Sequence, residues 1–164
     1  MKAYVESLNI SDGGVPKRAV PKARVTAAGM VGDRQRDLRS HGGPDRALCV
    51  WAAELIEALR AEGHPIRAGD AGENLTLRGV NWAAMQAGAR FRVGTVEAEV
   101  TGFTTPCDNL RPFFIEQRFS RISHKVHPGW SRVYARVLVE GEVAVGAEFH
   151  LMADPPAGAS VTGA

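Results

Sequence analysis

The 164-residue sequence contains only two cysteines, Cys49 and Cys107. Two thiols cannot form the disulfide framework of a small secreted domain, so we expect a reducing compartment and a cytoplasmic location. A chain of this length buries roughly two thirds of its unfolded surface and folds without such a framework. Apolar runs are also short, because none approaches the ~18 residues of a membrane-spanning helix and the N-terminus lacks the apolar core of a signal peptide. We therefore expect no membrane partner.

Several motifs of common enzyme classes are missing as well. There is no P-loop, no dinucleotide-binding Gly-x-Gly-x-x-Gly and no nucleophile elbow of a serine hydrolase. The basic residues form no dense run interleaved with aromatic residues, so we expect no nucleic-acid partner. Hydrophobic residues make up 45% and charged residues 23%, which is typical of a globular protein. Length and composition predict one domain over residues 1–152 and a flexible tail, rich in Pro, Gly and Ala, over residues 153–164.

Charge is unevenly distributed, although the net charge is only +2. Residues 1–46 carry nine Lys and Arg against five Asp and Glu, and residues 111–136 carry six against one. Residues 47–110 and 137–164 have net charges of −3 and −4. Two basic segments can favour an anionic ligand. Scattered surface arginines give the same count, so charge alone leaves both interpretations open.

Strand patterns dominate the chain. Segments that alternate between apolar and polar residues are separated by turns, and Gly94-Thr95 is typical of a tight hairpin. The expected strands are residues 4–9, 24–28, 73–77, 90–93, 96–103, 133–139 and 148–152. Many short strands with turns between them predict a barrel or a sandwich rather than a βαβ sheet.

Two helices are expected between these strands. Ala52–Glu62 places Leu55, Ile56 and Leu59 on one face, and the following Gly63 ends the helix. A second helix is expected from Asp108 to about Phe119, with Pro112 in its first turn, where proline is tolerated.

Cys107 is the residue that most suggests chemistry. It follows the strand predicted over residues 96–103 and precedes the second helix, so the helix N-terminus can stabilise its thiolate. A thiolate there can act as a nucleophile, a soft-metal ligand or a persulfide carrier. A small buried side chain is the equally weighted alternative. Cys49 lies in the apolar run Ala47–Trp51, which we expect to pack in the core.

Two glycine-rich turns and a histidine pair are further candidates. His41–Arg46 combines paired glycines with His41 and Arg46, which would suit an anion such as phosphate. A Gly-Pro-Asp turn before a helix is the equally weighted alternative. Gly72–Leu75 is a tight turn that carries one acidic and one amide side chain. His124 and His127 form His-x-x-His, which could bind zinc together with Cys107 or His41, but the usual zinc spacings are absent.

Taken in order, these clusters resemble the MOSC (molybdenum cofactor sulfurase C-terminal) domain, over about residues 3–152. No single piece is decisive, but the ordered set with suitable gaps is specific. The chain looks most like the stand-alone bacterial branch that includes the 6-hydroxylaminopurine reductase. The matching pieces are Gly32–Gln35, His41–Leu48, Gly69–Thr76, Gly88–Gly94, Thr105–Cys107 and Gly129–Trp130, followed by Arg136–Val143.

The resemblance implies a mainly β fold with a few helices, closed into a barrel-like structure, and a molybdenum–pterin cofactor. By position, Cys107 matches the family cysteine that ligates molybdenum or carries sulfur. The resemblance implies that further residues line the same pocket. Two arginines are added to these pocket residues because of their positive charge. These are His41, Gly42, Gly43, Gly72, Glu73 and Asn74 from the family motifs, and Arg46 and Arg111 from charge. Pyridoxal phosphate is not expected, because the chain is too short to include the domain that binds it in the eukaryotic sulfurase.

The leading hypothesis is a molybdenum-dependent oxidoreductase that reduces N-hydroxylated small molecules, with Cys107 as metal ligand. Two cysteines cannot hold a four-cysteine iron–sulfur cluster, so an external reductase must donate the electrons. One alternative is a sulfur-carrier or cofactor-delivery module, in which Cys107 receives a persulfide from a sulfur donor protein. Another is a non-catalytic ligand-binding domain. The sequence leaves a homodimer open.

Overall fold

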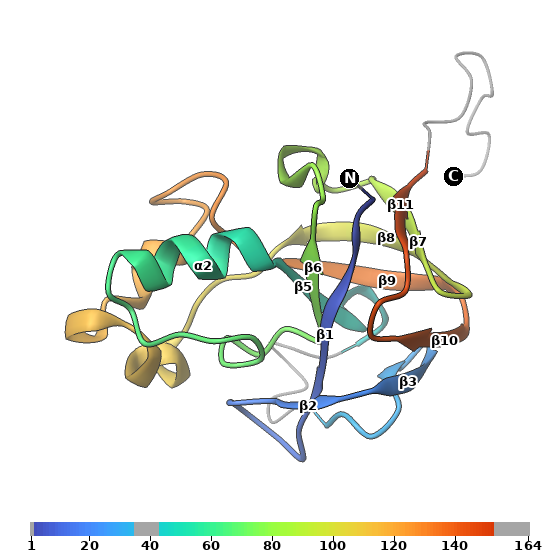
Figure 1. Cartoon of the computed structure of the whole chain (residues 1–164), viewed down its shortest axis with the longest axis horizontal. Helices are drawn as coiled ribbons and strands as arrows, with labels where there is room; N and C mark the ends of the chain where they lie inside the picture. Colours follow the sequence, from blue (N-terminus) through green and yellow to red (C-terminus); the bar gives the residue numbers. More distant parts are fainter. Residues whose placement is uncertain (1, 35–42, 153–164) are drawn as a thin grey trace.

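The computed structural model describes residues 2–34 and 43–152. The strands in these residues are β1 (Tyr4–Ile10), β2 (Arg18–Val20), β3 (Lys22–Thr26), β4 (Gly29–Met30), β5 (Leu48–Ala52), β6 (Leu75–Arg78), β7 (Arg90–Val93), β8 (Val96–Phe103), β9 (Val133–Val139), β10 (Gly141–Ala144) and β11 (Phe149–Leu151). They form an eight-stranded sheet in the order β11-β7-β8-β9-β5-β6-β1-β2 and a three-stranded sheet in the order β10-β3-β4 (Figure 1). The mainly β class predicted from the sequence is confirmed.

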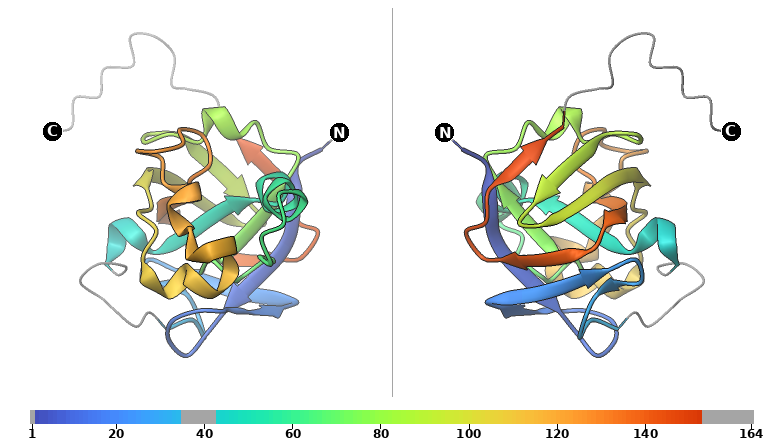
Figure 2. Two further views of the ribbon diagram at one scale, coloured as in Figure 1. Left: turned by 90° about the vertical axis from the view of Figure 1, so that its left-hand side faces the viewer. Right: turned by 90° about the vertical axis from the view of Figure 1, so that its right-hand side faces the viewer.

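The eight-stranded sheet curls but does not close. Figure 2 shows the curled strands from two opposite sides. β11 pairs with β7 along its length, whereas it meets β1 only near a single bridge between Tyr4 and Glu148. β1 is already paired with β6 on one side and with β2 through Leu8–Ile10, and β11 ends after three residues. The contact is therefore too short for a continuous ladder, and the prediction of a closed barrel is wrong.

Two apolar clusters form the core. The larger lies inside the curled sheet, where alternate residues of β7 and β8 are buried, among them Phe91, Val96 and Val100. The smaller lies between Trp51 at the end of β5, the helix α2 (Ala53–Ala61) and the segment after Cys107. Its members Ile56, Leu59, Leu110 and Ile122 come from segments far apart in the sequence. This second cluster fixes the position of the chain that follows Cys107.

All seven predicted strands and the helix near residues 52–62 are present, within two residues of the expected ends. The second predicted helix is wrong. Its segment forms three short 3-10 helices, η3 (Asp108–Phe113), η4 (Ile115–Gln117) and η5 (Phe119–Ile122). Pro112 lacks the N–H that an α-helix needs, and Glu116 and Gln117 adopt left-handed φ angles of 53° and 59°. The imidazole of His64 accepts a hydrogen bond from the Ile115 N–H at 3.0 Å.

β5 is a strand that the sequence patterns miss, because its apolar run leads directly into the following helix. All five of its residues are buried, and it lies between β6, which is parallel to it, and β9, which is antiparallel. A strand covered on both faces has a continuous apolar run and lacks the alternation that identifies a half-exposed strand. Two further 3-10 helices, η1 (Pro44–Arg46) and η2 (Trp82–Ala84), complete the described elements. None of the described helices is long and apolar enough to cross a membrane.

Gly94, in the β7–β8 hairpin, provides a test of how the two sheets meet. A Cβ at Gly94 would lie 2.4 Å from the carbonyl oxygen of Glu142 on β10, whereas a Cβ at Gly88 would meet no atom within 4 Å. Both glycines have a positive φ, so backbone strain of ~1–2 kcal/mol applies to both alanine variants. We expect Gly94→Ala to lower the free energy of unfolding by about 1–3 kcal/mol more than Gly88→Ala, as overpacking does. Chemical denaturation measures this, and equal losses would contradict the close approach of the two sheets.

Candidate functional site

Three neighbouring strands bring the two cysteines to either side of Tyr134. On β9, Tyr134 pairs with Cys49 of β5 and with Gly102 of β8. The chain after β8 leads to Cys107, which is the N-cap residue of η3. The pKa of Tyr134 is raised to about 12, mainly by burial and in part by Cys49 and Cys107, while the charges of Arg132 and Arg46 oppose the rise. We refer to Cys49, Cys107, Tyr134, Arg46 and Arg132 as the thiol–tyrosine cluster.

The two thiols differ in their surroundings. Cys107 is partly exposed, as a nucleophile or metal ligand must be, and its carbonyl accepts a hydrogen bond from the Leu110 N–H at 3.0 Å. Its predicted position at a strand-to-helix junction is confirmed, although the helix is of the 3-10 type. Cys49 is buried, as predicted, and burial raises the pKa of its thiol. Its neighbours are nevertheless polar, because Arg132, Glu73 and Lys17 also act on that pKa.

Asn74 cross-links the polar interior beside Cys49. Its side chain is buried; its Oδ1 accepts a hydrogen bond from the Cys49 N–H at 3.0 Å. Its Nδ2 donates to the carbonyl oxygen of Asn9 at 3.2 Å and to Oδ2 of Asp33 at 2.9 Å. One amide thus joins β5, β1 and the turn after β4 through good hydrogen bonds.

Asp33 is the acidic partner in this network. Its carboxylate accepts hydrogen bonds from Lys17 Nζ at 2.6 Å and from the Ser11 N–H at 2.9 Å, in addition to the bond from Asn74. The Lys17 and Asp33 side chains are only 7% and 5% exposed. A buried charge pair of this kind is stable only because further hydrogen bonds satisfy it, so loss of either partner leaves a costly buried charge.

Glu73 is fully buried next to Asn74. Burial raises the pKa of its carboxyl group to about 7, although hydrogen bonds from the Gly69 and Glu73 backbone and from Thr76, together with the charge of Arg132, oppose the rise. The Thr76 hydroxyl donates to Glu73 Oε2 at 3.0 Å. Glu73 Oε1 has no hydrogen-bond partner among the residues that the structure describes.

Two further buried polar atoms nearby lack partners in the described parts of the chain. They are Nε of Arg132 and Oγ1 of Thr104, and the latter lies beside the Cys49 thiol without ordinary hydrogen-bond geometry. Arg132 is 6% exposed, and its Nη1 donates to the carbonyl oxygen of Ala71 at 2.5 Å. Buried polar groups in native proteins are nearly always paired, so unpaired atoms in one region indicate a place for a polar ligand or water.

The remaining predicted residues are placed as follows. The guanidinium of Arg46, at the end of η1, lies 5.4 Å from the centre of the Tyr134 ring. Gly43 precedes η1 with a φ of 95°, and Gly72 has a φ of 85°, so both turns use backbone that favours glycine. Arg111 is half-exposed on η3 and bonds to Asp108 at 3.1 Å, which directs it to its own helix. His41 and Gly42 lie outside the described residues.

The structure also bears on the charge and zinc interpretations. Four of the six basic residues in the segment 111–136 form ion pairs with acidic residues, namely Arg111 with Asp108, Arg118 with Glu116, Arg121 with Glu62 and Arg136 with Glu99. The surface around this segment is therefore less positive than the segment's own charge count indicates.

The zinc interpretation depends on His124 and His127. The ring of His124 stacks on Phe103, with 3.6 Å between centroids. Within residues 2–34 and 43–152, no three His, Cys, Asp or Glu side chains converge as a metal site would require.

Sequence patterns missed Lys17, Thr104, Arg132 and Tyr134. Each stands in or beside a strand pattern or a loop with no motif of its own. The pairing of β9 with β5 and with β8 places Thr104, Arg132 and Tyr134 near the cysteines. Lys17 is placed by its ion pair with Asp33. Their signal in the sequence is weak: Arg132, for example, stands between polar Ser131 and apolar Val133, where a surface position is the ordinary expectation.

The comparison with protein families finds that residues 37–150 match the MOSC domain. The "Uncharacterized protein YflK" of Bacillus subtilis (strain 168) is 32% identical over 151 residues, which cover 90% of this chain and 67% of that protein. "Protein YiiM" of Escherichia coli (strain K12) is 30% identical over 137 residues, 78% of this chain and 58% of YiiM. The chain thus spans about two thirds or less of these relatives.

Solved structures share the fold. The crystal structure of YiiM from Geobacillus stearothermophilus superposes with a TM-score of 0.72 at 24% identity, covering 92% of this chain and 75% of that one. A hypothetical protein of known crystal structure gives a TM-score of 0.75 at 26% identity, with 94% and 70% covered. The curled sheet with its helical segments is therefore the architecture of these proteins too.

The buried carboxyl of Glu73 gives a prediction for stability against pH. Between the ordinary pKa of 4.5 and about 7, the folded protein keeps the Glu73 proton, whereas the unfolded chain releases it. Stability must then fall as pH rises through this range, by on the order of 3 kcal/mol for a shift of this size. We expect Glu73→Gln, which cannot ionise, to lose this component of the pH dependence. Urea denaturation of both proteins between pH 5 and 8 measures it, and parallel curves would show that Glu73 is ionised in the fold.

Proposed function

Because the chain belongs to the MOSC domain family, we propose that it binds a molybdenum–pterin cofactor at the thiol–tyrosine cluster and reduces N-hydroxylated compounds there. The observation that carries the proposal is the group of unpaired polar atoms of Glu73, Thr104 and Arg132, buried around the Cys49 thiol. The partly exposed Cys107 lies on the other side of Tyr134. The domain family is generally associated with this cofactor, and the residues present suit it.

The donor set fits such a group chemically. Cys107 offers a thiolate sulfur, which is a ligand that soft metal centres prefer. Arg46 and Arg132 supply positive charge and planar donors that suit a phosphate group. Tyr134 keeps its proton at neutral pH because its pKa is about 12, so it brings no negative charge to the site. The cluster combines a soft ligand and cations, which an anionic metal–pterin group requires.

The overall reaction converts an N-hydroxylated amine into the amine and water, and it consumes two electrons and two protons. When bound, the cofactor supplies the redox chemistry at the oxygen. The chain's own residues would bind and orient the cofactor: Cys107 would hold the metal, and Arg46 and Arg132 would neutralise the cofactor's charge. Tyr134 lies between the two thiols and stays neutral there. The electrons must come from a partner reductase, since the chain has only two cysteines and cannot hold a four-cysteine cluster.

The second candidate function is sulfur transfer through a persulfide on Cys107. It is supported by the contrast between the two thiols, because Cys107 is partly exposed whereas Cys49 is buried. A carrier needs an accessible sulfur that a donor protein can reach. Both functions use the same residue, and they differ in whether the sulfur stays in the chain or leaves it.

Metal content separates the molybdenum proposal from a zinc site. Purified from a host that makes the cofactor, the protein should contain molybdenum at close to one atom per chain and little zinc. Plasma mass spectrometry gives the metals, and fluorescence of the oxidised pterin gives the organic part. About one zinc per chain without molybdenum would rule the proposal out.

Replacement of Cys107 separates the ligand from the carrier. If Cys107 ligates molybdenum, Cys107→Ser removes one Mo–S contact from the X-ray absorption spectrum and abolishes reduction of hydroxylated bases. If it carries sulfur, the parent protein gains the mass of one sulfur after incubation with a cysteine desulfurase, cyanide removes that sulfur, and Cys107→Ser gains none.

Cys49→Ser is the matched control, because it changes the other thiol by the same atom. We expect it to lower thermal stability and to leave the sulfur loading and the Mo–S contacts unchanged. A Cys107→Ser protein with full metal content, full activity and unchanged sulfur loading would refute both functions and favour a non-catalytic binding domain.

A further inference from the structure

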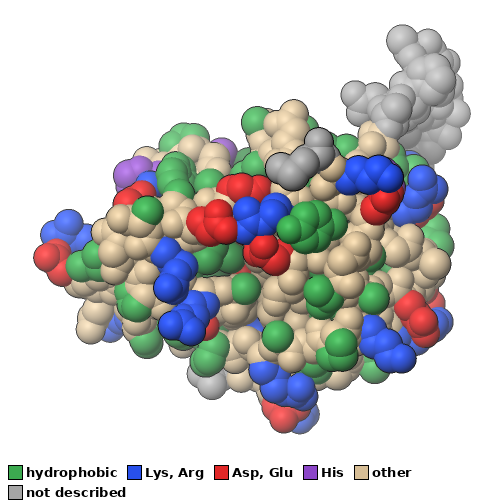
Figure 3. Space-filling view, in the orientation of Figure 1, with side chains coloured by type: hydrophobic (Ala, Val, Ile, Leu, Met, Phe, Trp, Pro, Cys, Tyr) green, Lys and Arg blue, Asp and Glu red, His purple; other side chains and the backbone are tan. Residues whose placement is uncertain are grey.

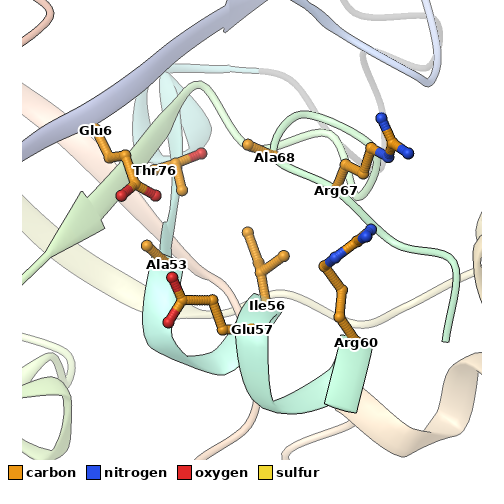
Figure 4. Close-up of a pocket in the computed structure, with 8 residues that line it drawn as sticks. All are labelled: Glu6, Ala53, Ile56, Glu57, Arg60, Arg67, Ala68 and Thr76. Carbon is orange, nitrogen blue, oxygen red and sulfur yellow. The ribbon is translucent and has the colours of Figure 1, made fainter. Parts of the chain in front are cut away.

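A pocket of about 390 Å³ lies on a different part of the surface, and its lining includes no residue of the thiol–tyrosine cluster. It is formed by α2, by the loop that follows α2, and by β1 and β6 (Figure 4). Ala53 and Ile56 of α2 are buried and make an apolar floor, with Ala68 at the edge. The volume is within the range of pockets that bind small organic molecules, which starts at about 300 Å³.

The two ends of the pocket differ in charge. At one end are the carboxylates of Glu6 and Glu57, and at the other are the guanidiniums of Arg60 and Arg67, as Figure 4 shows. Arg78 pairs with both carboxylates, with 2.6 Å between its Nε and Glu6 Oε1. Figure 3 shows acidic side chains gathered around a basic one on this face. The acidic end is therefore already occupied by a cation from the protein.

The arginine end is not neutralised in the same way. Arg60 Nη1 donates to the carbonyl oxygen of Ile66 at 3.0 Å, which holds the side chain along the pocket and leaves its other donors available. Asp70 is near both arginines, but its carboxylate accepts a hydrogen bond from the Arg67 backbone N–H at 2.8 Å. In the described parts of the chain, no carboxylate oxygen lies within 4 Å of either guanidinium. Two arginine forks without acidic partners are suited to a carboxylate or a phosphate.

The pocket is connected to the buried polar interior by one side chain. Thr76 is fully buried and lines the pocket, and its hydroxyl donates to Glu73 and accepts from Asn9 Nδ2 at 3.2 Å. The bond from Asn9 holds β6 against β1, so the strand wall of the pocket is fixed. A fixed wall with charged groups at its rim costs a ligand little reorganisation.

We infer that this pocket binds a small organic anion, a carboxylate or a phosphate monoester. The apolar body lies against Ile56 and Ala68, and the anionic group lies between Arg60 and Arg67. The site is independent of the proposed molybdenum chemistry, since it uses none of the residues that would hold the cofactor.

The test uses benzoate and phenyl phosphate as probes, with benzyl alcohol as the neutral analogue of similar size. Each is titrated into ¹⁵N-labelled protein, which at 17.6 kDa is suitable for two-dimensional NMR. We expect one or both anions to give saturating shifts of the Ile56, Arg67 and Ala68 amides, and to bind at least tenfold more tightly than benzyl alcohol. The stronger of the two anions identifies the ligand as a carboxylate or a phosphate.

Two variants assign the binding to this pocket. Arg67→Ala removes a guanidinium whose side chain makes no ion pair with the described residues, and it should weaken the anion at least tenfold. Ala68→Phe fills the pocket without a change of charge, and it should abolish the shifts. Arg92→Ala is the control, since it removes an exposed arginine on β7 and should leave the affinity unchanged.

Thermal melting of each variant confirms that it is folded before titration. No saturating shift with either anion would overturn the inference. So would equal affinity for benzyl alcohol, or an unchanged affinity in folded Arg67→Ala and Ala68→Phe proteins. None of these results depends on metal content or on reductase activity, so the two proposals can fail separately.

Discussion

The buried amide of Asn74 is the interaction on which the rest of the site depends. It takes one hydrogen bond from the Cys49 backbone and gives one each to Asn9 and Asp33. Those three partners belong to β5, to β1 and to the turn after β4, and the sheet joins β5 to β1 only through β6 and does not include that turn. An amide buried here must keep all its bonds, because each unpaired polar atom costs about 1–3 kcal/mol. The β5–β9 pairing sets Cys49 opposite Tyr134, and the Asn74 amide fixes the Cys49 backbone to the polar interior on its other side.

Around this amide the protein accepts an unusual amount of buried polarity. Lys17 and Asp33 neutralise each other, whereas Glu73 and Arg132 each leave one atom unpaired among the described residues. Such groups lower stability unless they are satisfied by something else. These groups lie around the buried Cys49 thiol, and the partly exposed Cys107 lies on the other side of Tyr134, which is why we propose the cofactor site at this cluster. The raised pKa of Glu73 is the electrostatic consequence of the same burial.

The organic-anion pocket follows a different physical rule. Its charged groups are at the surface, where water screens them, and their value to a ligand comes from geometry rather than from desolvation. Arg78 neutralises one end and leaves the arginine forks at the other, so the pocket selects anions by the position of its unpaired cations. Thr76 joins the strand wall of this pocket to Glu73. The two regions share one wall and differ in exposure, charge and ligand.

The sequence by itself determined the elements whose signals are local. Alternation identified β7, β8 and β9 to the residue, and the apolar face of α2 together with Gly63 identified that helix. Ordered short motifs were enough to indicate the MOSC family and to single out Cys107 and Glu73-Asn74.

Tertiary structure decided everything that depends on which strands are neighbours. The apolar run before α2 forms the central strand β5. The sheet stays open because β11 is too short to form a continuous ladder with β1. The segment after Cys107 forms short 3-10 helices. Tertiary structure also brought Tyr134 and Arg132 to the cysteines and Arg60 and Arg67 to one pocket. These outcomes come from pairing and burial across long stretches of chain, and a local pattern carries no information about the partner that a residue will meet.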